Sequence, residues 1–144
     1  MRRRVAILSL MLGLVLTMAG PARSGQLILA VIVHPERRPT LTLDDLARIY
    51  LRKRRFWHDG TPIIPVNHEA GTVTREAFSR RVLGRTRAQL ARYWDQRYFD
   101  GIFPPVTLHS DAAVREYVAR DRNAIGYISS AAVDSSVHVA LRLK

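Results

Sequence analysis

The sequence predicts an α/β layer fold with a mostly parallel sheet flanked by helices, because strand-like runs alternate with capped helical patterns. Runs of β-branched and aliphatic residues occur at 26–34, 62–66, 106–108, 124–128 and 138–143. The helical patterns between them each begin beside a hydroxyl residue that is suited to capping a helix. In sheets of this kind, ligands bind where the carboxyl ends of strands meet the starts of helices.

The first residues have the layout of a secretory signal. A basic start precedes a mainly apolar run over 5–19, and small residues follow it. The run is shorter than the ~20 residues that a membrane-spanning helix needs, so a retained anchor is the less favoured alternative. We therefore expect residues 1–22 to be a signal peptide, with cleavage near Ala22 to Gly25. Residues 26–144 are expected to form a single domain in a bacterial periplasm.

Composition favours a binding protein for anions over an enzyme. The chain has 23 basic and 12 acidic residues, and without the three arginines of the signal its net charge is +8. A field of this sign raises the local concentration of anions. The sequence has no cysteine, and its five histidines are dispersed without a zinc-binding spacing. No nucleophile–base set is present either, so we expect no enzyme activity, no cofactor and no metal site.

Capping patterns locate the expected helices. Thr42 with Asp45 and Thr86 with Gln89 fit the capping box, whereas Thr72 and Ser110 are expected to act as single caps. Gly84 and Asn123 are expected to end helices in the left-handed conformation. The residues expected to face the core are Leu43, Leu46, Ile49, Tyr50, Val73, Ala77, Phe78, Val82, Leu90, Val114, Tyr117 and Val118.

Aromatic residues at helical spacing form a stripe in the third predicted helix. Its members are Tyr93, Trp94, Tyr98 and Phe99. Such stripes are usually buried, so we expect this one in the core. An exposed part would be an interface for a second subunit.

The stretch "NHEAGTVTREAF", residues 67–78, follows a predicted strand and leads directly into a predicted helix. The free amides and the partial positive charge of a helix start attract anions. The turn therefore predicts an anion site. The alternative is a capping turn without a ligand, because Thr72 is also able to accept from the amide of Thr74 or Arg75.

Four segments together resemble phosphate-type periplasmic solute-binding proteins, especially short members described as phosphate transporter substrate-binding-like. The segments are "LTLDDLARIYLRKRRFWHDGTPIIPVN", "GTVTREAFSRRVLG", "YWDQRYFDGIFPP" and "NAIGYISSAAVDSSVHVALRL", and they cover nearly the whole mature chain in the family's order. The resemblance implies a single lobe of the type II periplasmic-binding-protein fold. It also implies a small oxyanion ligand, with phosphate foremost, and an ABC permease or another envelope protein as a partner in phosphate uptake.

The resemblance places the oxyanion site in the turn before the second helix. The implied ligand-binding residues are His68, Gly71, Thr72, Val73, Thr74 and Arg75. Gly71 and the two threonines match the family's pattern. His68 stands where the family has arginine, Val73 replaces a second glycine, and Ala70 replaces the aspartate that accepts a proton from hydrogen phosphate. The family's other phosphate loop has no counterpart in this chain.

These departures leave a second hypothesis open, in which a non-enzymatic envelope interaction protein kept the fold and lost the ligand. The basic loop Arg52–Arg55 beside Phe56 suits an acidic partner or anionic lipid headgroups. Arg52 also stands where the family usually has glycine. We expect no nucleic-acid binding, since the chain carries an export signal and no nucleic-acid fold signature. Self-association is a further expectation, because two copies would rebuild a two-lobed cleft.

Overall fold

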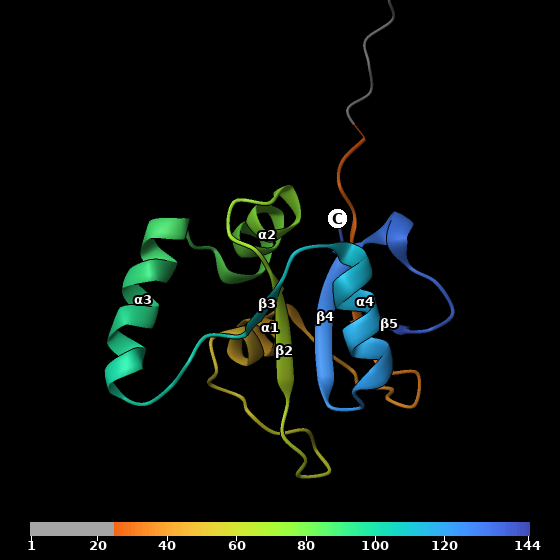
Figure 1. Ribbon diagram of the computed structural model, residues 1–144, viewed down its shortest axis with the longest axis horizontal. Helices are drawn as coiled ribbons and strands as arrows, with labels where there is room; N and C mark the ends of the chain where they lie inside the picture. The colour runs from red at the N-terminus through yellow and green to blue at the C-terminus, as the bar shows by residue number, and fades with distance from the viewer. Residues whose placement is uncertain (1–24) are drawn as a thin grey trace, which may run out of the picture.

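The computed structural model describes residues 25–144, so the predicted signal peptide lies outside the described residues. A five-stranded sheet has the order β3-β2-β4-β1-β5 and is flanked by helices (Figure 1). The strands are β1 (Leu29–Val33), β2 (Ile64–His68), β3 (Val106–Leu108), β4 (Ala124–Ser129) and β5 (His138–Leu143). The helices are α1 (Leu43–Tyr50), α2 (Val73–Phe78), α3 (Arg87–Phe99) and α4 (Asp111–Arg120), with a π-helical turn η1 (Ser79–Leu83) and a 3-10 turn η2 (Ser130–Ala132).

Four strands run in one direction and β1 runs against them. The ladders β2–β3 and β2–β4 are parallel, whereas β1 pairs antiparallel with both β4 and β5. The predicted α/β layers and the mostly parallel sheet are therefore confirmed. None of the helices within residues 25–144 is long and apolar enough to cross a membrane.

The sheet is buried on both faces, which explains why β1 is apolar throughout. Leu29, Val31 and Val33 pack with α1 and α2 on one face, whereas Ala30 and Ile32 pack with α4 on the other. Successive side chains of a strand point to opposite faces, so a strand covered on both sides needs apolar residues at every position.

The predicted capping boxes are present at α1 and α3. In α1, the Thr42 hydroxyl accepts from the Asp45 amide at 3.1 Å, and the Asp45 carboxylate accepts from the Thr42 amide at 2.9 Å. Hydrogen bonds from Thr42, followed by the charge of Arg54, lower the pKa of Asp45. One prediction is wrong here: Leu43 is 51% exposed, because it is the first helical residue and lies off the buried stripe.

Two further predictions about helix ends need correction. Val73 is 75% exposed, because it is the first residue of α2 and lies off the buried side that Ala77 and Phe78 form. Asn123 does not end α4, which stops at Arg120 and continues through an extended Asp121. Among residues 25–144 the non-glycine residue with a left-handed backbone is Arg52, at φ 59°. Arg52 thus adopts a backbone conformation that glycine adopts more readily than other residues.

The aromatic stripe of α3 is mostly outside the core, contrary to expectation. Leu90 is buried and the Tyr93 hydroxyl donates to the Leu51 carbonyl at 2.8 Å, but Tyr98 is 62% and Phe99 89% exposed. Figure 1 shows α3 at the margin of the molecule, beyond α2 and β3. The N-terminal half of α3 packs against the rest of the fold, whereas its C-terminal end is exposed to solvent.

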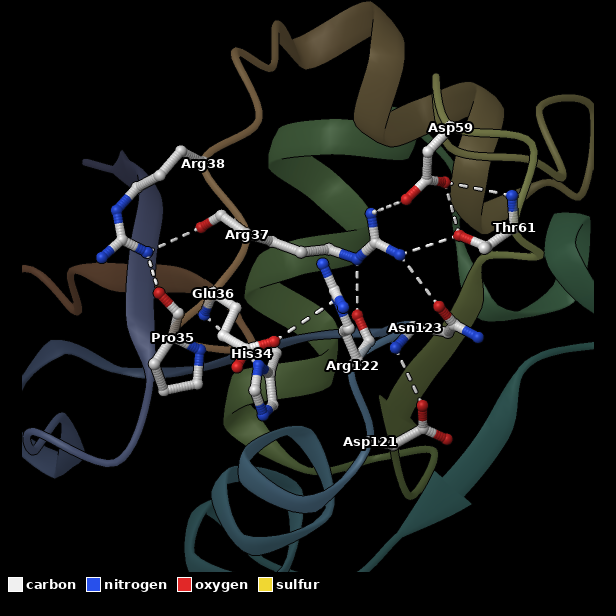
Figure 2. A network of polar contacts seen from close by, with 10 residues as sticks. All are labelled: His34, Pro35, Glu36, Arg37, Arg38, Asp59, Thr61, Asp121, Arg122 and Asn123. Atoms are coloured by element: carbon white, nitrogen blue, oxygen red, sulfur yellow. Dashed lines mark hydrogen bonds and ion pairs between the residues drawn. The ribbon is translucent and has the colours of Figure 1, made fainter.

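Arg37 joins three turns at the edge of the sheet where β2 and β4 begin. Its guanidinium donates to the Asn123 side chain at 2.9 Å, to the Thr61 hydroxyl at 2.8 Å and to Asp59 at 3.2 Å (Figure 2). The same group lies 4.7 Å from the ring centroid of Trp57, which is 5% exposed. This planar, always charged group therefore holds the turns before both strands in place.

Gly126 allows α4 to pack closely against β4, so adding a methyl group there should destabilise the protein. A Cβ at this position would lie 2.6 Å from Val114 Cγ1 and 3.2 Å from Val118 Cγ2. We expect Gly126→Ala to lower the free energy of unfolding in urea by about 1–3 kcal/mol, as overpacking does. Ser135→Ala is the control, because this residue is exposed and its side chain makes no hydrogen bond within residues 25–144. Equal midpoints for the two variants would contradict this packing.

Asp59 should make stability fall in acid. The Thr61 hydroxyl and amide, followed by Arg37, lower the pKa of this carboxyl to about 2. A lowered folded-state pKa contributes stability above the unfolded value of ~3.9 and loses it as the pH falls toward the folded value. We therefore expect the difference in melting temperature between the wild type and Asp59→Asn to be present at pH 5 and to disappear near pH 2. A difference that stays constant over this range would contradict the assignment.

Candidate functional site

The candidate site lies at the edge of the sheet where β2, β3 and β4 end. Because these strands are parallel, their carboxyl ends meet the starts of α2 and α4 at the same edge, the upper one in Figure 1. The turn 69–72 connects β2 to α2 there, and the Glu69 amide donates to the Leu108 carbonyl at 3.1 Å. The polar turn identified in the sequence is thus at the edge where ligands bind in sheets of this type.

β2 changes its partner halfway along its length, and this opens the sheet at the site. The β2–β4 ladder ends at Pro65, and from Val66 onward β2 pairs with β3 instead. Proline has no amide hydrogen, so it is unable to donate to a ladder. Side chains satisfy the backbone groups that this leaves: the Tyr50 hydroxyl lies 3.1 and 3.2 Å from the carbonyls of Val66 and Ile125.

His68 belongs to this internal network. It is the last residue of β2, is 2% exposed, and its Nε2 donates to the Tyr127 carbonyl at 2.8 Å. The same Nε2 lies 3.4 Å from Asp111 Oδ1, and Asp111 Oδ2 accepts from the Ser129 amide at 3.2 Å. The structure thus places His68 beneath the turn, where it links β2 to β4 and α4. It does not join the outward-facing groups of the turn.

Burial keeps the neighbouring tyrosines neutral. Burial raises the pKa of Tyr50 and of Tyr127, and the charge of Arg75 opposes this rise at both residues. The Tyr127 hydroxyl donates to the side chain of Asn67. These hydroxyls therefore act as hydrogen-bond donors within the fold.

Thr72 caps α2. Its Oγ1 accepts from the Arg75 amide at 3.2 Å and donates to the Glu69 carbonyl at 3.0 Å. The Arg75 side chain donates from Nη1 to the His68 carbonyl at 2.6 Å, so it closes the turn from the other side. The capping alternative is therefore correct for the Thr72 hydroxyl, and the amide that it caps is that of Arg75.

Other groups of the turn are free of partners inside the part of the chain that the structure describes. The amides of Val73 and Thr74 and the Thr74 hydroxyl make no hydrogen bond there. Thr74 is half-buried and Gly71, at φ 89°, is exposed. These groups lie together at the start of α2 and are able to donate hydrogen bonds to an anion.

Arg87 of α3 completes the site, and the sequence reasoning missed it. A Cβ built on Gly71 would lie 2.3 Å from Arg87 Nη2, so the end of this exposed side chain lies against the turn. The Arg87 side chain makes neither an ion pair nor a hydrogen bond within residues 25–144. No local pattern identifies it, because it is brought to the turn by the packing of α3 beside α2.

A small pocket lies between α2 and α3, directly beside the turn. Its volume is about 160 Å³. Its lining residues are Ala70, Arg75, Glu76, Ser79, Arg87, Leu90, Ala91 and Trp94. Two arginines thus line a mainly apolar cavity that begins at the turn, and their positive charge favours a small anion there. Among residues 25–144 there is no group of three or more His, Asp or Glu side chains placed to hold a metal ion.

Structural comparison identifies the class of fold. The chain is similar to a Clostridium perfringens protein described as a phosphate ABC transporter substrate-binding protein, solved with bound phosphate, at 28% identity and a TM-score of 0.64 over 78% of this chain. It is similar to an ABC-type phosphate transport receptor from Vibrio cholerae at 25% identity and a TM-score of 0.65, again over 78% of this chain. PstS from Borrelia burgdorferi matches over 72% of this chain and 42% of its own, with a TM-score of 0.56 and 19% identity.

The resemblance to phosphate-type substrate-binding proteins is thereby confirmed, and the fold is that of a single lobe of a periplasmic-binding protein. The chain spans 44% of the Clostridium protein and 46% of the Vibrio protein, less than half of each. No protein-family model and no curated protein sequence matches the chain.

The capping role of Thr72 predicts a stability effect that is separate from ligand binding. Removing a side-chain cap costs about 1 kcal/mol of stability, so Thr72→Ala should lower the free energy of unfolding by that amount. Thr72→Ser keeps the capping oxygen and should recover most of the loss. Urea denaturation of the three proteins without added anion checks this. If the serine and alanine variants unfolded at the same urea concentration, the cap would be excluded as the cause.

Proposed function

We propose that this chain is an exported, periplasmic solute-binding protein that recognises a small oxyanion, with phosphate as the leading candidate, in connection with phosphate uptake. It has no catalytic role in this proposal. An ABC permease is the partner that such a role would need. Removal of the predicted signal peptide would leave the single domain 26–144.

The proposal rests on one observation: Arg75, Arg87 and two backbone amides without partners lie together at the turn before α2. The similarity to a phosphate ABC transporter substrate-binding protein and an ABC-type phosphate transport receptor supports it, and open α/β sheets bind ligands at the carboxyl ends of their strands. Both cations lie beside the same pocket, and the Val73 and Thr74 amides and the Thr74 hydroxyl supply further donors. We assign the contacts to these groups, with Thr72 and His68 supporting the turn.

The proposed site differs from a fully enclosed one. A buried phosphate needs most of its oxygens hydrogen-bonded, because an unpaired buried charge is costly. The donors described within residues 25–144 come from the start of α2 and from α3. With Ala70 in place of the family's aspartate, the turn also lacks the carboxylate that accepts a proton from hydrogen phosphate. We therefore propose binding of modest strength with weak discrimination between phosphate and sulfate.

A second function is favoured by an exposed aromatic beside the basic loop. Phe56 is 56% exposed and follows Arg52–Arg55, whereas Trp57 is buried. Within this loop Arg54 pairs with Asp45 at 2.9 Å and Arg52 donates to the Ile63 carbonyl at 3.2 Å, which leaves Lys53 and Arg55 exposed. An envelope interaction protein that lost its ligand would bind an acidic partner here. Charge reversal at Lys53 and Arg55 should then abolish crosslinking to that partner.

Calorimetric titration with phosphate tests the proposed function. We expect phosphate at millimolar concentration to bind the wild type, and Arg87→Gln to weaken binding about tenfold, the scale of a lost hydrogen bond to a charged group. The remaining binding should depend less on salt, because one cation has been removed.

Arg92→Gln is the matched control, since this exposed residue of α3 does not line the pocket. It should bind phosphate as the wild type does. Absence of any heat with phosphate and with sulfate would contradict the proposed function, as would equal losses in the two variants.

A further inference from the structure

The pocket between α2 and α3 holds a carboxylate that an oxyanion site does not need. Glu76 lies one position after Arg75 and lines the same cavity as Arg75 and Arg87. A carboxylate beside two cations would normally pair with one of them. Within residues 25–144, however, Glu76 makes no ion pair and its side chain makes no hydrogen bond. Two arginines and one glutamate thus line the same cavity, and the glutamate forms no ion pair with either arginine.

The remaining wall of the pocket is apolar. Leu90, Ala91 and Trp94 of α3 supply it, and Ala70 closes it next to the turn. Leu90 is 5% exposed and Trp94 is half-buried, so this wall belongs to the inward side of α3. An inorganic oxyanion has no group to place against such a wall. A short hydrocarbon chain would bury apolar surface there.

The pocket is small and partly open to solvent, so the part of a ligand that it holds is a few heavy atoms in size. A volume of about 160 Å³ holds roughly five waters at about 30 Å³ each. This suits a phosphoryl group joined through two carbons to one further group. It excludes nucleotides and sugars as fully enclosed ligands.

We propose that this pocket binds a small zwitterion in which a phosphoryl group and an ammonium group are joined by a two-carbon chain. The phosphoryl group lies against Arg87 and Arg75, the ammonium group pairs with Glu76, and the carbons contact Trp94. Two compounds share this chemistry, the phosphonate 2-aminoethylphosphonate and the ester phosphoethanolamine. The inference rests on the proposed function, because it uses the same two cations for the anionic end.

Comparison of three ligands by calorimetry on the purified full chain tests the ammonium subsite. Ethylphosphonate matches 2-aminoethylphosphonate but lacks the ammonium group. We expect the wild type to bind at least one of the two zwitterions about tenfold more tightly than ethylphosphonate, as a hydrogen-bonded charge pair provides. The tighter of the two identifies whether the phosphonate or the ester is preferred.

Glu76→Gln should remove this preference while leaving ethylphosphonate binding unchanged or stronger. Asp95→Asn is the matched control, because this exposed carboxylate of α3 lies outside the pocket. Equal affinities of the wild type for the zwitterions and ethylphosphonate would overturn the inference, and that comparison needs no variant. A preference that survives in Glu76→Gln would overturn it as well.

Inorganic phosphate separates this inference from the proposed function. If phosphate binds and the zwitterions gain nothing over ethylphosphonate, the proposed function stands and the zwitterion subsite is wrong. If none of the phosphoryl compounds binds, both are wrong.

Discussion

The position of the candidate site depends on the point at which β2 stops pairing with β4. The ladder between them ends at Pro65, and β2 then continues beside β3. The backbone groups left at this opening are satisfied by buried side chains, above all Tyr50 and His68. Because those side chains fix the end of β2, they also fix the turn that follows and the direction in which α2 begins.

Because the end of β2 is fixed in this way, neighbouring polar residues of the turn have different roles. Residues on the inner side of the turn, His68 and Thr72, hold the backbone and have their hydrogen bonds within the fold. Groups on the outer side, the amides of Val73 and Thr74, point away from such partners. Arg87 arrives from α3 and adds its charge over Gly71. The anion site that we propose therefore depends on the packing of α3 beside α2 as much as on the turn itself.

Local patterns predicted most of the fold and only part of the candidate site. Capping boxes depend on residues three apart, so Thr42 with Asp45 and Thr86 with Gln89 were predicted correctly from the sequence. Exposure depends on where an element ends relative to its neighbours, and for that reason Val73 and Phe99 were predicted wrongly as core.

The role of Arg87 was missed because its place over Gly71 is set by tertiary packing. The alternation of strands and helices correctly predicted that the turn lies at the edge of the sheet where the parallel strands end. The resemblance did not reveal that His68, at the family's arginine position, is turned inward.

A crystal structure of the protein grown with phosphate tests whether the start of α2 binds an anion. We expect density for one phosphate there, within hydrogen-bond distance of the Arg87 guanidinium and of the Val73 or Thr74 amide. A pocket closed by its own side chains, or a phosphate bound only at the basic loop Arg52–Arg55, would contradict this expectation.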